Sequence, residues 1–287
     1  MSDPFRRLVE DELGQPVDPK VSAMAEAIAA RHGDSSRAVL FYGSCLRQKQ
    51  LDGLMLDFYL IVSDYRAAYA KRWLAKANSL IPPNVFPFQH GNLAAKYAVL
   101  SEADFHRLNG PETRNVSVWA RFAQPSRLIW ASDAAARDRA IDAVARAAPT
   151  LLGAARPFPQ GDELQPWRHA FSLTYSAELR AERKGRSVSI VDTDPDRYRR
   201  FLKPALAAIE GSAQRGGWAR RRIEGKLLSV LRLAKASATY VGGAEYIVWK
   251  INRHAGTNIE LKPWQKRHPL LAAISLLPRL LRSGAIR

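Results

Sequence analysis

The sequence predicts an α/β head over residues 1–150, a mostly helical domain over 160–240 and a basic amphipathic C-terminal segment over 241–287. Short apolar segments of strand length alternate with helical patterns in the head. Pro and Gly are frequent in residues 149–166, which predicts a linker, and the patterns that follow are helical. Strands mixed with helices, then helices alone, are typical of a mixed sheet with flanking helices followed by a helical domain.

The elements of the head follow from local signals. Ser101 with Asp104 three residues later is a helix-start pattern, and Gly33 is a typical residue after a helix end. Pro82 and Pro83 interrupt the chain before the next strand. The predicted head elements are a helix over 21–31, strands over 38–42 and 56–62, a helix over 65–77, strands over 85–88 and 93–100, a helix from Ser101 and a helix over 137–148.

The helical region contains four further apolar patterns with a helical period. The predicted helices cover residues 167–183, 196–209, 218–238 and 244–254.

Composition limits the classes of function. The chain has 287 residues, of which 47% are hydrophobic, so it can bury a sizeable core. The single cysteine, Cys45, excludes an internal disulfide framework, and the six histidines show no metal-ligand spacing. Acidic residues among residues 1–13 argue against a signal or transit peptide, and no apolar stretch approaches the roughly 20 residues of a membrane span. We expect a bacterial cytoplasmic protein, peripheral on the inner face of the membrane.

Positive charge is concentrated near the C-terminus. The formal net charge is +17, and residues 211–287 hold 15 Lys or Arg against 3 Asp or Glu, which places +12 of that charge there. Such a surplus attracts polyanions, either nucleic acid or an anionic membrane surface. A solvated surface without a partner is the alternative.

The turn after the first strand carries the most specific signal. An apolar strand ends at Tyr42, Gly43 and Ser44 follow, and the next strand carries one acid, Asp57. This is the layout of a nucleotidyltransferase core, in which the turn lets triphosphate oxygens approach backbone N–H groups and the acid holds Mg²⁺. A tight turn between two core strands, with an acid at the edge, is the alternative interpretation.

Two further groups could meet phosphate. Lys96 lies in an apolar strand, where an ammonium needs an anion or a route to solvent on an edge strand. On a predicted helix, Glu178 and Glu182 share a face beside a basic cluster of Arg180, Arg183 and Lys184. Arginine binds phosphate oxygens bidentately, so the cluster could hold a triphosphate or a lipid headgroup, or could form a surface ion-pair network.

These segments, in their order, resemble the Tam family (mitochondrial translocator assembly and maintenance proteins) of CDP-diacylglycerol synthases and its bacterial relatives. The resemblance covers residues 37–206. The matching segments are Tyr42-Gly43-Ser44, Leu56-Asp57-Phe58, Lys96-Tyr97-Ala98-Val99, Tyr175 to Arg180 and Val188 to Val191.

Five positions depart from the family pattern, among them Ala98 and Ala177, which replace glycines. Cys45 replaces the second glycine of the turn, and Glu178 stands where the family has aspartate. Tyr59 occupies the position of the second strand acid in the general nucleotidyltransferase pattern, so a second metal ligand would come from Asp52 or Glu178.

The resemblance implies that this chain is a phosphatidate cytidylyltransferase, which transfers CMP from CTP to phosphatidic acid with Mg²⁺ and releases pyrophosphate. It implies catalytic roles for Asp57, Lys96 and Arg180 and metal binding by Asp57 and Asp52. The nucleotide-binding residues that we expect are Tyr42, Gly43, Ser44, Arg47, Lys96, Glu178 and Arg183. Arg47 is included because it lies on the same loop.

A lipid substrate would also account for the C-terminal region. Trp218, Trp249 and Trp264 lie among basic residues, and 269–281 is amphipathic, as in an interfacial membrane anchor. We therefore expect CTP, phosphatidic acid and an anionic membrane surface as partners, and no nucleic acid. The alternatives are a helical domain with inward-packed Trp, a nucleotidyltransferase acting on RNA or another small acceptor, and a catalytically inactive basic binding module.

Overall fold

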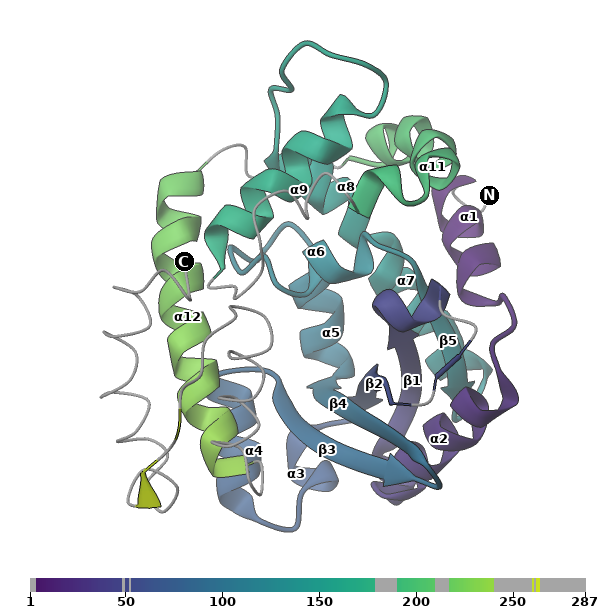
Figure 1. Cartoon of the computed structure of the whole chain (residues 1–287), viewed down its shortest axis with the longest axis vertical. Coiled ribbons are helices and arrows are strands. Elements are labelled where there is room, and N and C mark those ends of the chain that lie inside the picture. The colour runs from purple at the N-terminus through teal and green to yellow at the C-terminus, as the bar shows by residue number, and fades with distance from the viewer. Residues whose placement is uncertain are drawn as a thin grey trace.

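Five strands form one mixed sheet in the order β3-β4-β2-β1-β5 (Figure 1). In this computed structural model the described residues are 4–47, 50, 51, 53–178, 190–209, 217–239, 260, 262 and 263. The strands are β1 (Ser36–Tyr42), β2 (Met55–Val62), β3 (Asn84–His90), β4 (Leu93–Ser101) and β5 (Ser126–Ala131). β2 and β4 are parallel, and the other neighbouring strands are antiparallel.

Helices cover both faces of this sheet (Figure 1). The α-helices are α1 (Pro4–Leu13), α2 (Pro19–Ala30), α3 (Tyr65–Ala68), α4 (Arg72–Leu80), α5 (Glu102–Asn109), α6 (Trp119–Phe122), α7 (Ala134–Ala145), α8 (Ala147–Ala154), α9 (Gln165–Ala177), α11 (Pro195–Ala207) and α12 (Trp218–Thr239). Two 3₁₀ turns, η1 (Gly33–Ser35) and η2 (Ser44–Arg47), flank β1. Asp18, Ser101, Asp133 and Asp194 each accept a hydrogen bond from the backbone N–H of the helix that follows, which fixes four of the helix starts.

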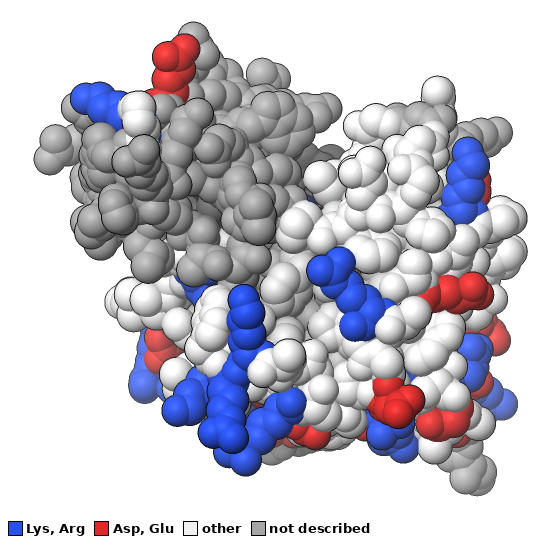
Figure 2. Space-filling model, turned by 90° about the horizontal axis from the view of Figure 1, so that it is seen from below, with Lys and Arg blue, Asp and Glu red and all other residues white. Residues whose placement is uncertain are grey.

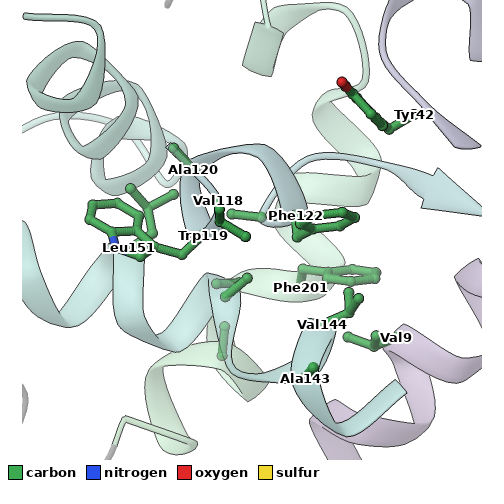
Figure 3. Close-up of a cluster of buried hydrophobic side chains, with 14 of the residues drawn as sticks. Val9, Tyr42, Val118, Trp119, Ala120, Phe122, Ala143, Val144, Leu151 and Phe201 are labelled. Carbon is green, nitrogen blue, oxygen red and sulfur yellow. The ribbon is translucent and has the colours of Figure 1, made fainter. Parts of the chain in front are cut away.

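The two faces of the sheet are separate hydrophobic clusters. The period of two along a strand sends Phe41 and Phe58 to one face, which α2 covers, and Tyr42 and Tyr59 to the other. The second cluster is the larger, and it joins this face of the sheet to α1 and to α5–α9 and α11. Figure 3 shows part of it, including Phe122 of α6 and Phe201 of α11.

The predicted fold class, a mixed sheet with flanking helices followed by helical elements, is confirmed. Helices α9 and α11 share the larger cluster with the head. The domain boundaries that we expected stay a prediction. The predicted helix over 244–254 and nearly all of the segment 241–287 lie outside the described residues.

Three predicted boundaries are wrong. The helix over 65–77 is divided into α3 and α4, because Tyr69 is extended and buried, with its hydroxyl bonded to Asn78. The predicted linker does not begin at Pro149, which is the third residue of α8, where a helix tolerates proline. The helix predicted over 167–183 ends at Ala177, and the backbone of Glu178 is extended. Glu178 therefore does not share a helix face with residue 182.

In the described part of the chain, no helix has both the length and the apolar character that crossing a bilayer requires.

Candidate functional site

The turn after β1 requires glycine for two independent reasons. Gly43 has a φ of +95°, a left-handed conformation that side chains disfavour. A Cβ atom at this position would lie 3.2 Å from Oδ2 of Asp57, which is closer than ordinary van der Waals contact. The turn continues into η2, where the N–H of Leu46 donates to the carbonyl of Gly43 over 3.2 Å. The backbone of the Gly43–Ser44 turn is therefore packed directly against the Asp57 carboxylate.

Asp57 and Lys96 form an ion pair in the N-terminal halves of their strands. They are direct neighbours in the parallel β2–β4 register, and Tyr42 is opposite Asp57 in the antiparallel β1–β2 register. Nζ of Lys96 lies 3.0 Å from Oδ1 of Asp57, and the side chains are 23% and 22% exposed. This contact is an ion pair without hydrogen-bond geometry, so the buried Oδ1 accepts no hydrogen bond from the described residues. One carboxylate oxygen thus keeps an unused capacity to accept a hydrogen bond or to bind a cation.

Lys96 does not lie on an edge strand. β4 is flanked by β2 and β3, so the interpretation of Lys96 as an edge residue that reaches outward is wrong. The ammonium in this interior strand is compensated by the Asp57 carboxylate, and both side chains remain partly open to solvent.

Cys45 does not resemble a nucleophile. It is buried, and its Sγ donates to the carbonyl of Met55 over 3.6 Å. Burial, followed by the nearby negative charge of Asp57, raises the pKa of its thiol. Cys45 is therefore a neutral side chain that packs beneath the turn at the position of the second glycine.

Next to Asp57 on the same face lies an aromatic pair with an arginine. The ring centroids of Tyr42 and Tyr59 are 5.3 Å apart, and the guanidinium carbon of Arg121 is 4.7 Å from the Tyr42 ring centroid. Burial raises the pKa of Tyr59, while the positive charges of Arg121 and Arg232 lower it. The position of a second strand acid is therefore filled by a buried, neutral tyrosine within electrostatic reach of two guanidinium groups.

The half-buried Arg121 interacts electrostatically with both acids of the site. Burial lowers its pKa, but the tyrosines and the charges of Asp57 and Glu178 more than compensate, so the pKa lies above its ordinary value. Glu178 follows the end of α9 and faces Arg121 and Arg232.

Arg232 reaches the site from α12. Gly225 lets this helix pass closely over the carbonyl of Ala177, at the end of α9, because a Cβ would meet that oxygen. Arg232 then donates from Nε to the carbonyl of Pro82 and from Nη1 to Oγ of Ser117, both over 2.8 Å. Its Nη2 is buried without a hydrogen-bond acceptor among the described residues.

The structure brings several predicted site residues together and adds two. Tyr42, Gly43, Ser44, Asp57, Lys96 and Glu178 lie at one end of the sheet. Asp52, Arg180, Arg183 and the side chain of Arg47 lie outside the described residues. Sequence reasoning missed Arg121 and Arg232. Neither belongs to a recognisable motif, and Arg232 was grouped with the basic C-terminal surplus.

The donor set suits a magnesium ion held mainly by its substrate. Among the described residues, no group of three His, Cys, Asp or Glu side chains could hold a metal. Mg²⁺ at nucleotide sites commonly uses one or two carboxylates together with substrate phosphates and water. Asp57, with a buried oxygen that accepts no hydrogen bond from the described residues, fits that requirement as the single carboxylate.

Comparison with known proteins gives weak structural likenesses. No protein-family model and no curated protein matches the chain. The crystal structure at 1.90 Å of a nucleotidyltransferase-like protein from Exiguobacterium sibiricum 255-15 aligns over 92% of this chain and 92% of that one, with 13% sequence identity and a TM-score of 0.29. A TM-score of 0.29 does not establish a common fold, and this likeness carries no conclusion about the chain.

Proposed function

We propose that the chain is a magnesium-dependent nucleotidyltransferase, and that it transfers CMP from CTP to phosphatidic acid at a membrane surface. The supporting observation is the left-handed Gly43–Ser44 turn packed against the Asp57–Lys96 pair where β1 ends and β2 and β4 run side by side. This arrangement offers backbone N–H groups, a hydroxyl, a cation and a carboxylate at one end of a sheet, which are the groups that a nucleoside triphosphate with its metal requires.

In the proposed reaction, a phosphate oxygen of phosphatidic acid attacks the α-phosphorus of CTP. A new P–O bond forms, the bond between the α-phosphorus and the bridging oxygen breaks, and pyrophosphate leaves. The attacking oxygen is already ionised at neutral pH, so no side chain has to remove a proton. Gly43 and Ser44 position the triphosphate and Lys96 neutralises part of its charge, so the rate gain comes from positioning and electrostatics. Mg²⁺, held by Asp57, would neutralise further charge on the phosphates and on the leaving group.

A membrane surface as partner is supported by exposed side chains on α12. Ile223 and Leu227, one turn apart, are 72% and 59% exposed, and Leu231 continues the same stripe. Arg222 and Lys226 are exposed beside it. A helix with an apolar stripe flanked by basic residues matches an anionic lipid interface in both polarity and charge.

A second exposed segment, α3–α4, has the same character. Trp73 is 47% and Leu80 is 79% exposed on α4. The exposed basic residues of this segment are Arg66, Lys71, Arg72 and Lys76. α3 and α4 lie at the lower end of the molecule in Figure 1, and Figure 2 shows that Lys and Arg gather on one side of the face seen from there. We propose that these segments contact the anionic membrane that supplies the lipid.

The test is a paired turnover assay of wild type and Asp57→Asn. Each protein is incubated with CTP, Mg²⁺ and phosphatidic acid in mixed micelles, and both CDP-diacylglycerol and pyrophosphate are measured. Asp34→Asn, which changes an exposed acid away from the site, is the matched control. We expect lipid-dependent turnover in wild type and control, and its loss in Asp57→Asn.

Two results would overturn the proposal in different ways. CTP binding by wild type without turnover on the lipid would identify another acceptor. Absence of CTP binding would favour the inactive basic module, an alternative that the ion-paired Asp57 and the buried Tyr59 also permit.

A further inference from the structure

The site contains more cationic groups than one nucleotide-binding turn needs. Lys96 is paired with Asp57, while Arg121 and Arg232 both interact electrostatically with Tyr59 and with Glu178. The described side chains of the site therefore hold three cations and two carboxylates. A partly buried cluster with a surplus of positive charge is stabilised when an anion binds to it.

Arg232 provides the second observation. Two of its nitrogens are fixed by the Pro82 carbonyl and the Ser117 hydroxyl, so the guanidinium is held in one orientation. The remaining guanidinium nitrogen, Nη2, is buried and has no acceptor among the described residues. Buried N–H donors almost always have an acceptor, so this one points to an acceptor that arrives with a ligand.

Arg121 is held just as firmly by a different contact. Its guanidinium lies over the ring of Tyr42, the direct strand neighbour of Asp57. This cation–π contact restrains the guanidinium, whose N–H groups can meet planar or tetrahedral oxyanions bidentately. Arg121 also lies close enough to Asp57 for their charges to interact.

We propose that Arg121 and Arg232 form a second anion subsite beside the Asp57–Lys96 pair, and that it binds the phosphomonoester group of the acceptor. This inference rests on the proposed function, because it assigns the second phosphate of that reaction. The nucleotide phosphates then lie at the Gly43 turn and Lys96, the acceptor phosphate lies at the two arginines, and Asp57 is between them. The cations reduce the repulsion between the two anions that this transfer brings together.

The test measures binding of two ligands to three variants by calorimetry. The acceptor probe is dihexanoyl phosphatidic acid, which is short enough to remain monomeric, and the nucleotide probe is CTP with Mg²⁺. Arg121→Gln and Arg232→Gln should each raise the Kd of the lipid probe at least about tenfold and leave the Kd of CTP within about twofold. Arg200→Gln, an exposed arginine on α11 outside the site and outside the proposed membrane surface, is the matched control and should change neither.

Further arms identify the source of the phosphate and guard against misfolding. Glycerol 3-phosphate and inorganic phosphate replace the lipid in parallel titrations, and tighter binding of the lipid probe than of either identifies a lipid headgroup as the ligand. Arg232→Gln also loses two structural hydrogen bonds, so Arg232→Lys is measured beside it, and thermal melts verify that each variant is folded. Arg121→Gln leaves those two bonds intact.

Failure of the subsite and failure of the proposed function are separable. Lipid-dependent turnover with an unchanged Kd for the lipid probe in both arginine variants would overturn the subsite alone. A loss of CTP affinity instead of lipid affinity would also overturn it, because the arginines would then bind the nucleotide. Tight, arginine-dependent binding of the lipid probe by a wild type that shows no turnover would support the subsite and overturn the proposed reaction.

Discussion

Two ion pairs in this molecule have the same chemistry and opposite surroundings. Arg197 of α11 and Glu12 of α1 are 4% and 10% exposed, and two guanidinium nitrogens donate to the carboxylate. A third nitrogen donates to the carbonyl of Ala123 over 3.1 Å, and the guanidinium lies over the Phe201 ring. Each nitrogen of the Arg197 guanidinium thus donates a hydrogen bond to a protein acceptor, and the group packs against the core.

The Asp57–Lys96 pair is less complete. Its side chains are 23% and 22% exposed, at least twice the exposed fractions of the Arg197–Glu12 pair. Oδ1 of Asp57 accepts no hydrogen bond from the described residues. A fully satisfied pair holds two helices together and has no capacity left for a ligand. A partly satisfied pair in adjacent strands stabilises the fold less and keeps that capacity. The comparison predicts that the two pairs respond oppositely to mutation.

Arg197→Met should have the largest effect, and on stability. It leaves the Glu12 carboxylate buried without its partner, so we expect a loss of about 3–5 kcal/mol in the free energy of unfolding. Chemical denaturation monitored by tryptophan fluorescence measures it. The double variant Glu12→Leu/Arg197→Met should lose less than the single one, because no uncompensated charge remains. A single variant as stable as wild type would show that this pair does not hold α11 to α1.

Asp57→Asn should have the opposite effect, with little loss of stability and a large loss of turnover. Its partner Lys96 is partly exposed, so we expect the free energy of unfolding to change by less than about 1 kcal/mol. Turnover should fall by about 10²–10³-fold, which corresponds to roughly 3–4 kcal/mol of lost transition-state stabilisation. Denaturation curves and initial rates on the same preparation measure both quantities. A destabilised variant with full activity per folded molecule would assign Asp57 a structural role.

Gly43→Ala separates backbone strain from contact with the carboxylate. The left-handed φ of +95° should cost about 1–3 kcal/mol, and the added Cβ would also press on Oδ2 of Asp57. Gly91→Ala is the control, since Gly91 also has a positive φ but has no atom within 4 Å of a Cβ. We expect both variants to lose stability and only Gly43→Ala to lose CTP affinity, measured by calorimetry. Equal CTP binding by both would mean that the turn does not contact the nucleotide.

The comparison also explains which features the sequence could reveal. Gly43, Asp57 and Lys96 lie in short motifs, so their chemistry and their approximate location could be predicted locally. Their pairing could not, because it depends on the register between β2 and β4. Arg121 and Arg232 come from a one-turn helix and from a long basic helix, and only tertiary packing directs them to the site.

Two predicted element boundaries, at Tyr69 and at Pro149, are wrong for similar reasons. Tyr69 interrupts a helical pattern because its hydroxyl binds Asn78 in the interior, a contact that periodicity cannot show. The sequence predicts a linker that begins at Pro149, but Pro149 lies in the first turn of α8, where a proline removes no helical hydrogen bond.

Lys235 extends the comparison to a half-buried cation that donates to backbone carbonyls. Its Nζ donates to the carbonyls of Ile81 and Pro83, next to Arg232 on the same helix. Burial, with a further contribution from the charge of Arg232, lowers its pKa from the ordinary value of 10.5 to about 7. Between these two values the unfolded chain holds a proton that the folded chain has released.

Stability should therefore rise with pH from about 7 towards 10.5, by at most about 1.4 kcal/mol per pH unit. Below pH 7 both states are protonated and this contribution is constant. Lys235→Met should remove the rise, so the difference in the free energy of unfolding between wild type and variant should change with pH over 7–9. Urea denaturation of both proteins at several pH values measures that difference. Other titrating groups contribute equally to both proteins, so their contributions cancel. A difference that is independent of pH would mean that the two carbonyl acceptors keep Lys235 charged in the folded state, as the Asp57 carboxylate does for Lys96.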